Sequence, residues 1–208
     1  MKIFAALFAS IAITLLSQGS SQAEDFGYTT NNGTVTITQY QGPGGAVVIP
    51  SSINQLPVVA LGNFVFAFVG SGLKVTNIAL PSTLTVIGEG GFDGCPNLAT
   101  ISVDTASTAF VSVDGVLFSK DQTALVAFPN GRAGTYSIPD GVTTLGDYAF
   151  YFCSGLTGAT IPNSVTNIGQ WSFAGCGNLA TVTVGNSVSS IGSLAFSWCG
   201  PGLRHDSR

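Results

Sequence analysis

Charged side chains are scarce in this chain. Only 8% of its 208 residues are Asp, Glu, Lys or Arg, against about 25% in an ordinary domain, and the net charge is −4. Nucleic acids and anionic membrane surfaces attract proteins through concentrated Lys and Arg, so neither is an expected partner. Gly, Ser, Thr and Asn fill the polar positions instead. Such a surface suits contact with proteins or carbohydrate, and it is equally common on secreted β-rich proteins.

Histidine is nearly absent as well. The one histidine, His205, lies close to the C-terminus, so catalysis by a Ser-His or Cys-His pair has no suitable base. The sequence contains no P-loop and no C-x-x-C, and we expect no cofactor and no metal. Paired carboxylates are harder to dismiss, but Asp140 and Asp147 lie beside Gly141 and Gly146, in turn positions where Asp commonly satisfies backbone donors. We therefore predict no catalysis.

Long apolar runs are absent beyond the N-terminus. Lys2 precedes an apolar run over residues 3–16, and small residues lead to a predicted cut after Ala23, which is typical of a secretory signal peptide. The alternative is an uncleaved anchor helix, but this run is short for a bilayer core of about 30 Å. We predict a signal peptide at 1–23, export to the extracellular space or cell surface, and no membrane insertion after cleavage.

What the sequence has in abundance is a repeat. Cysteine recurs at 153, 176 and 199 and phenylalanine at 150, 173 and 196, so both series advance by 23 residues. A fixed period of about 20 to 50 residues is typical of a solenoid, in which each coil buries its apolar face against its neighbours. The residue before the Pro/Gly position of the repeat marks six rungs: Ile49, Leu80, Val103, Ile138, Ile161 and Val184. Their steps are 31, 23, 35, 23 and 23 residues.

One repeat unit predicts one coil of backbone. Val182 and Val184 alternate as in a half-buried strand, a turn follows at Gly185, and a second short extended piece ends at Ile191. The buried residues of 193–199 lie three apart, which predicts one helical or 3-10 turn. Stacked coils are expected to pair their strands into parallel sheets.

Two dipeptides between alternating apolar runs predict β-hairpins. Asn32-Gly33 lies in the segment 24–46, which we interpret as an N-terminal β-hairpin cap over the open edge of the first rung. Asp114-Gly115 lies within the 35-residue step and predicts a variant hairpin-containing repeat at 104–137. The whole solenoid is expected over 47–199, and an aberrant tail at 200–208 follows it.

Several consecutive units resemble the BspA-type leucine-rich repeat, which reads I-P-x-x-V-x-x-I-G-x-x-A-F-x-x-C. The matching segments are IPDGVTTLGDYAF at 138–150 and IPNSVTNIG at 161–169, and 113–121 resembles a variant unit often interleaved in such proteins. The resemblance covers about 47 to 199. It implies a leucine-rich-repeat right-handed superhelix of secreted or surface proteins, with adhesion or protein recognition as the usual inferred role. The tail departs from the pattern, which leaves a truncated or frame-shifted C-terminus open.

The four cysteines have two interpretations. An oxidising compartment favours disulfides, and adjacent coils would place Cys153, Cys176 and Cys199 about 5 Å apart. However, Val69 occupies the same column of the repeat in the first copy, as expected if these positions are small apolar ones. We favour buried free thiols, and leave disulfides open for all four cysteines, including Cys95.

Two columns of the repeat vary while their neighbours do not. They lie two and six residues after the repeat glycine and are rich in large aromatic residues. We predict that their aromatic members form a ligand-binding stripe: Tyr148, Trp171, Phe152, Trp198, Phe64 and Phe68. Outward-pointing rings can stack on sugars or anchor a protein partner. The alternative is that these rings wrap the outer shell of the core.

The sequence therefore predicts a secreted or surface-exposed module for protein or glycan recognition or adhesion. Two alternatives stay open. A parallel β-helix carbohydrate-active enzyme has coils of similar length, but it requires acid and base residues that are sparse here. The chain could also be a structural fragment of a larger surface protein.

Overall fold

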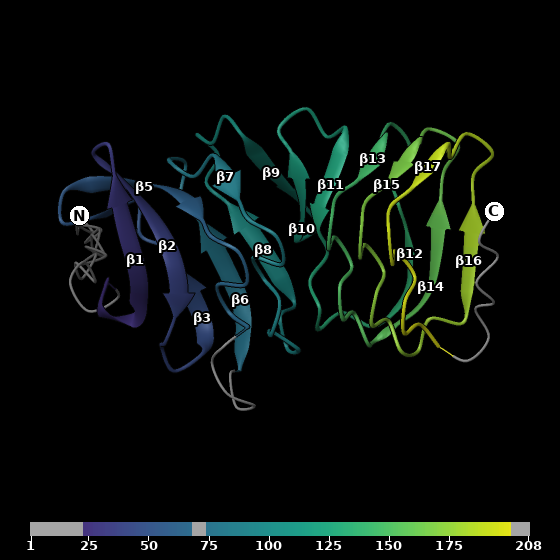
Figure 1. The fold of residues 1–208 in the computed structure, drawn as a ribbon, viewed down its shortest axis with the longest axis horizontal. Coiled ribbons are helices and arrows are strands. Elements are labelled where there is room, and N and C mark those ends of the chain that lie inside the picture. Colours follow the sequence, from purple (N-terminus) through teal and green to yellow (C-terminus); the bar gives the residue numbers. More distant parts are fainter. Residues whose placement is uncertain (1–22, 68–73, 201–208) are drawn as a thin grey trace, which may run out of the picture.

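The computed structural model describes residues 23–67 and 74–200, which form a β-solenoid of about seven turns (Figure 1). The expected repeat solenoid of short, mostly parallel strands is thereby confirmed. The predicted signal peptide lies outside the described residues except for Ala23, and the predicted tail lies outside them except for Gly200. Among the helices of the described residues, none is long and apolar enough to cross a membrane.

The described residues contain one short 3-10 helix and seventeen strands. In chain order these are η1 (Ala23–Asp25), β1 (Phe26–Asn31), β2 (Thr34–Tyr40), β3 (Gly45–Val48), β4 (Ser52–Ile53), β5 (Leu56–Leu61), β6 (Val75–Leu80), β7 (Val86–Ile87), β8 (Thr100–Val103), β9 (Phe110–Val113), β10 (Val116–Ser119), β11 (Ala124–Ala127), β12 (Gly134–Ser137), β13 (Thr144–Leu145), β14 (Leu156–Ile161), β15 (Asn167–Ile168), β16 (Thr181–Val184) and β17 (Ser190–Ile191).

The main strands of successive coils form two parallel ladders. One ladder runs β3-β6-β8 and the other β12-β14-β16. The six rung residues identified in the sequence stand at the ends of these six strands or directly after them. Other strands build two separate ladders, β2-β5-β7 and β11-β13-β15-β17, and the later members β7, β13, β15 and β17 have two residues each. Each full coil therefore contributes a main strand and a short strand with a turn between them.

A hairpin interrupts the ladders in the middle of the solenoid. Strands β9 and β10 pair antiparallel around Asp114 and Gly115, whose φ angles are 49° and 78°, as a tight two-residue hairpin turn requires. Strand β10 is buried on both faces. Val116 and Phe118 pack into the core cluster of the C-terminal coils, whereas Leu117 packs into that of the N-terminal coils. The variant segment thus divides one continuous core into two.

A second hairpin stands at the N-terminal end. Strands β1 and β2 pair antiparallel, and Asn32 and Gly33 form the turn with φ angles of 48° and 77°. Strand β2 pairs in parallel with β5, so the hairpin continues the ladder β2-β5-β7 at that end (Figure 1).

Phenylalanine forms a column through the core. Its members, from the first coil to the last, are Phe66, Phe92, Phe128, Phe150, Phe173 and Phe196. Neighbouring rings stack, with centroids 4.5 Å apart for Phe150 and Phe173 and 5.1 Å apart for Phe173 and Phe196. Within each core cluster the rings of adjacent coils pack against one another, so the column holds those coils together.

The four cysteines are free thiols in the structure, and three are buried. Thiols donate to phenylalanine carbonyls of the preceding coil: Cys176 Sγ lies 3.1 Å from Phe150 O, and Cys199 Sγ lies 3.2 Å from Phe173 O. Burial raises the pKa of Cys176 to about 12, so that thiol stays protonated and can donate. Cys153, Cys176 and Cys199 therefore each donate a hydrogen bond to the preceding coil, a role that valine cannot perform.

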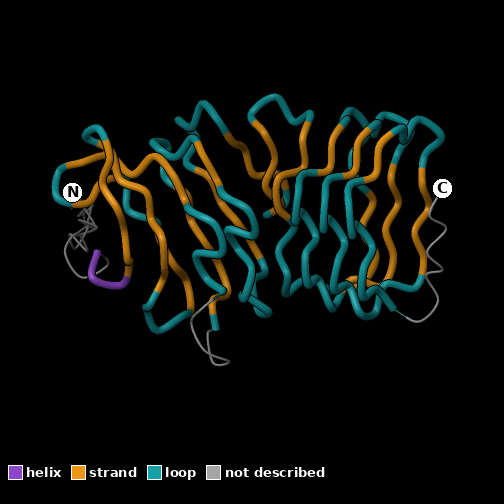
Figure 2. Tube along the Cα trace, viewed as in Figure 1, coloured by secondary structure: helices purple, strands orange, loops and turns teal. Residues whose placement is uncertain are grey.

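The predicted helical or 3-10 turn after each repeat glycine is not confirmed. The residues around Leu194 and Trp198 form successive tight turns, and Figure 2 shows the equivalent segments as loops. Hydrogen bonds between residues three apart are present, for example from Ser197 N to Leu194 O at 3.1 Å. However, Leu194 and Trp198 have φ angles of 57° and 55°, and such left-handed residues interrupt a right-handed helix.

Candidate ligand-binding surface

The two variable columns of the repeat share a left-handed backbone. The column two residues after the repeat glycine has φ angles of 53° at Phe64, 56° at Gly90, 59° at Tyr148, 54° at Trp171 and 57° at Leu194. The column six residues after it has 83° at Gly94, 53° at Phe152, 77° at Gly175 and 55° at Trp198. Phe68, the remaining predicted member, lies outside the described residues. Glycine adopts this conformation without strain, whereas each aromatic residue adopts it at a cost in conformational energy.

Most of the predicted stripe comes together in one aromatic cluster. Its members are Phe64, Tyr148, Tyr151, Phe152, Trp171 and Trp198. The Tyr148 and Trp171 rings are parallel within 5°, with centroids 6.3 Å apart. Tyr151 packs edge-on against both, at 5.1 and 6.1 Å. Trp171 also lies 5.4 Å from Trp198 in the next coil.

The aromatic cluster is partly open to solvent. Trp198 is 66% exposed and Phe152 is 47% exposed, whereas Tyr148, Tyr151 and Trp171 are half-buried against one another. The flanking Phe150 and Phe173 are fully buried. The rings of the cluster thus lie outside the phenylalanine column and offer apolar surface to a partner.

Glycine in the same columns makes room for the rings of neighbouring coils. A Cβ atom on Gly90 would collide with the Phe64 ring, and one on Gly175 would stand 2.8 Å from the Phe152 ring. The Phe64 ring thereby comes within 5.6 Å of Tyr148, measured between centroids. At Gly90 and Gly175, glycine therefore makes room for a large ring of the neighbouring coil.

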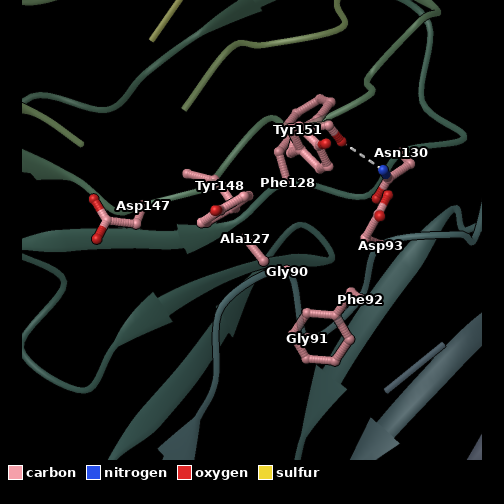
Figure 3. Close-up of a pocket in the computed structure, with 11 residues that line it drawn as sticks. Gly90, Gly91, Phe92, Asp93, Ala127, Phe128, Asn130, Asp147, Tyr148 and Tyr151 are labelled. Atoms are coloured by element: carbon pink, nitrogen blue, oxygen red, sulfur yellow. Dashed lines mark hydrogen bonds between the residues drawn. The ribbon is translucent and has the colours of Figure 1, made fainter. Parts of the chain in front are cut away.

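A small cavity lies beside the aromatic cluster (Figure 3). Its volume is about 30 Å³, room for about one water molecule. Asp93 and Asn130 line one end, and Tyr148 and Tyr151 line the side. The Asn130 amide Nδ2 donates to Tyr151 O at 2.6 Å and so ties the variant coil to the next one. The cavity is too small for a sugar or a peptide.

Carboxylates surround the two tyrosines. Burial raises the pKa of Tyr148, and the charges of Glu89 and Asp147 raise it further. Burial also raises the pKa of Tyr151, with the charge of Asp93 next. Burial raises the pKa of Asp93 itself, which a hydrogen bond from the Gly94 backbone opposes. The carboxyl groups of Glu89, Asp93 and Asp147 therefore lie on this side of the aromatic cluster.

The raised pKa of Asp93 predicts that its charge destabilises the fold at neutral pH. A carboxyl whose pKa is higher in the folded state stabilises most at low pH, and that stability is lost as pH rises through its folded pKa. We expect Asp93→Asn to raise the free energy of unfolding at pH 7 by less than about 1 kcal/mol, because the group is partly solvated. The gain should vanish at acid pH, which urea titrations at both pH values would measure.

Asp121→Asn is the matched control with the opposite sign. Hydrogen bonds from Ser119 and Thr123 lower the pKa of Asp121, so its stabilisation is present at neutral pH and lost as pH falls through its folded pKa. Asp121→Asn should therefore destabilise the chain at pH 7. A destabilised Asp93→Asn variant at pH 7 would contradict the role assigned to Asp93.

Sequence reasoning missed Tyr151. It lies between the phenylalanine column and the second variable column, at a position that holds Asp93, Ala174 and Ser197 in other coils. The sequence did indicate that this position is unusual in one coil, because Tyr151 is much larger than the residues there in the other coils. The spacing rule did not include the position, because only the structure shows the Tyr151 ring reaching Tyr148 and Trp171.

Other carboxylates serve the backbone. Asp147 Oδ1 accepts from Gln170 N at 2.8 Å, and Asp104 Oδ1 accepts from Ala106 N at 2.9 Å, as expected for Asp in turns. Within the described ranges, no group of three His, Cys, Asp or Glu side chains is placed to hold a metal ion. His205 lies outside those ranges.

Comparison with known proteins gives consistent similarity to leucine-rich repeats. The family model described as BspA type leucine rich repeat region matches six copies, over residues 47–131 and 122–201. No curated protein matches the sequence.

Solved structures with a similar fold come from bacteria. The pneumococcal vaccine antigen PcpA has a TM-score of 0.56 at 16% identity, over 88% of this chain and 80% of that one. A leucine rich cell surface protein from Faecalibacterium prausnitzii A2-165 has a TM-score of 0.53 at 24% identity, over 86% and 52%. The T. pallidum leucine rich repeat protein is 32% identical, with a TM-score of 0.44, over 84% and 65%. The chain thus spans about half of the second protein and less than two thirds of the third.

Proposed function

Because the chain belongs to the BspA-type leucine-rich repeat family, we propose that it is a secreted or surface-exposed binding module. It recognises a protein or glycan ligand, in the manner of an adhesion protein, and catalyses no reaction of its own. The aromatic cluster is the proposed contact surface. A cell surface protein among the structures of similar fold supports the proposed location.

The observation that carries this proposal is the placement of aromatic rings on left-handed backbone. A left-handed conformation costs a residue with a side chain roughly 1–2 kcal/mol, and Gly90, Gly94 and Gly175 show that glycine is accepted in the same columns. The fold therefore does not require Trp171 or Trp198 for its backbone geometry. Strained residues that present large rings to solvent are typical of binding sites.

The catalytic alternative has less support. A carbohydrate-active enzyme of this shape would need carboxylates free to act as acid and base. Asp104 and Asp147 are instead engaged with backbone N–H groups. Asp93, beside the aromatic cluster, lines a cavity too small for a sugar ring.

A binding screen tests the proposal. The purified chain would be applied to arrays of glycans and of extracellular proteins, together with Trp171→Gly. Glycine suits the left-handed backbone and removes the ring that joins Tyr148, Tyr151 and Trp198. We expect a ligand bound by the wild type to bind the variant at least tenfold more weakly, as at an aromatic hot spot.

Tyr28→Ala is the control for this screen. Tyr28 is 36% exposed, lies on strand β1 of the N-terminal hairpin and accepts a hydrogen bond from Asn54 Nδ2 at 2.8 Å. Its loss should leave binding unchanged. Equal binding by wild type and Trp171→Gly, both folded by circular dichroism, would refute the aromatic cluster as the contact surface. A folded wild type that binds nothing on either array would count against the binding module itself.

A further inference from the structure

A notch lies next to the aromatic cluster, on the side of the variant coil. Its volume is about 330 Å³, against about 30 Å³ for each water in the liquid, so it has room for a long side chain. Three successive coils line it, through Asp93, Gly94, Pro96, Asn130, Phe152 and Ser154. Asp93 and Asn130 also line the small cavity behind it.

The notch arises from one column of the repeat. Gly94, Asn130 and Phe152 each lie two residues after a member of the phenylalanine column, in three adjacent coils. Gly94 has a φ of 83°, and a Cβ atom there would stand 2.8 Å from Phe66 O, so the position accepts no side chain. The Phe152 ring, which is 47% exposed, therefore borders the open space beside Gly94.

The polar groups of the notch are mainly acceptors. Asp93 contributes a carboxylate. Asn130 donates one of its two Nδ2 hydrogens to Tyr151 O, and its Oδ1 can accept a hydrogen bond. Burial raises the pKa of Asp93, and none of the Lys and Arg side chains in the described ranges offsets that effect. Arg132 is engaged elsewhere, with its guanidinium 5.3 Å above the Phe128 ring and its Nη1 2.9 Å from Asp114 O.

We infer that this notch receives a lysine or arginine side chain from a basic segment of a protein partner. The inference rests on the proposed binding function and names the ligand class. The Phe152 ring would pack on the aliphatic stem and on the cation, as aromatic faces do with Lys and Arg. The Asp93 carboxylate would pair with the charge. Glu89 and Asp147, beside Tyr148, add to the negative potential that draws such a segment in.

Donor and acceptor chemistry favours a cationic side chain over a sugar. Lysine and arginine carry only donors, three and five respectively. They match a site whose Asp93 and Asn130 both offer oxygen acceptors. A neutral sugar hydroxyl can also donate to these oxygens, but it carries no positive charge for the carboxyl groups near the two tyrosines to attract. The destabilising charge of Asp93 is also explained if a partner neutralises it, since binding sites commonly retain such groups at the expense of stability.

Peptide binding by the purified chain tests the inference. The probes would be fluorescein-labelled peptides of eight residues that alternate Gly with Arg, Glu or Ser, and the readout would be fluorescence anisotropy. We expect the Arg peptide to bind and the Glu and Ser peptides to bind at least tenfold more weakly. Binding should weaken on raising the salt from about 0.1 M to about 1 M, where the screening length falls from about 10 Å to about 3 Å.

Three variants locate the site. Asp93→Asn removes the charge and keeps an acceptor for the Gly94 backbone, and Phe152→Gly removes the ring at a backbone that suits glycine. Each should weaken binding of the Arg peptide about tenfold. Asp140→Asn, on an exposed turn of the solenoid outside the notch, should leave it unchanged. Circular dichroism would confirm that all three are folded.

The outcomes separate this inference from the proposed function. If Asp140→Asn weakens binding as much as Asp93→Asn, the attraction is diffuse and the notch is not the site. If the Arg peptide binds no better than the Ser peptide while an array ligand still depends on Trp171, the inference is wrong and the binding module stands. If neither peptides nor array ligands bind, both fail.

Discussion

Replacing Phe150 by alanine is expected to lower the free energy of unfolding by about 3–5 kcal/mol, as for other buried phenylalanines. The Phe150 side chain is fully buried. Its ring stacks on Phe128 at 5.0 Å and on Phe173 at 4.5 Å, so one substitution removes contacts with the coils on both sides. In a solenoid, each coil is stabilised chiefly by its two neighbours, and the loss therefore weakens two interfaces.

Urea denaturation followed by circular dichroism would measure this effect. Phe196→Ala is the matched control, because Phe196 belongs to the same column but is only partly buried. It has one stacking partner in the column, Phe173, at 5.1 Å. We expect a loss less than half as large for the control. Equal losses for the two variants would show that coil-to-coil stacking does not determine the stability of the column.

The repeat made the ladders predictable from the sequence. The six rung residues were identified as the apolar residues before the Pro/Gly position of the repeat, and each one lies at the end of a main strand or directly after it. The Asn32-Gly33 and Asp114-Gly115 turns join antiparallel strands for a local reason, since both residues of such a turn need positive φ. Patterns that depend on neighbouring residues are visible in one sequence.

The shape of the turn after the repeat glycine could not be predicted in the same way. Apolar residues three apart occur both in a 3-10 helix and in a series of tight turns, so their spacing does not distinguish the two. The sign of φ distinguishes them, and only Gly90, Gly94 and Gly175 hinted at it. The aromatic residues in the same columns gave no indication of a positive φ, because large rings are uncommon on left-handed backbone.

The notch was beyond sequence reasoning for a different reason. Asp93, Asn130 and Phe152 come from three coils, and the variant repeat between them has its own length. The 35-residue step showed that this repeat contains extra residues. It did not show that β10 would enter the core, or that the turn of this coil would carry Asn130 where the next coil carries Phe152. Long-range placement of this kind depends on how the inserted hairpin packs.

Strand β10 also connects the fold to the proposed site. Because it divides the core, the coils before and after it meet at the level of Asp93 and Asn130. The aromatic cluster lies mainly on the later coils, whereas Glu89 and Asp93 lie on an earlier one. The proposed contact surface therefore spans the junction between the two core clusters, and a partner bound there would contact both.

Replacing Gly169 by alanine is the second change with a large expected effect. A Cβ atom at this position would stand 2.5 Å from Asp147 N and 2.6 Å from Gly146 C, both in the backbone of the preceding coil. Backbone cannot move aside as a flexible side chain can, so β15 would have to shift away from β13. That shift would break the bond from Gly169 N to Leu145 O, which is 2.8 Å long. We expect a loss of about 3 kcal/mol or more in the free energy of unfolding.

Gly177→Ala separates this steric effect from a general intolerance of alanine. A Cβ atom on Gly177 meets nothing within 4 Å, and its φ is not positive, so this variant should unfold at nearly the same urea concentration as wild type. A Gly169→Ala variant as stable as Gly177→Ala would mean that adjacent coils can separate freely at the repeat glycine. The glycine in each I-G pair would then not be what sets the close approach of the coils, and the aromatic cluster would lose the fixed spacing that brings Tyr148 against Trp171.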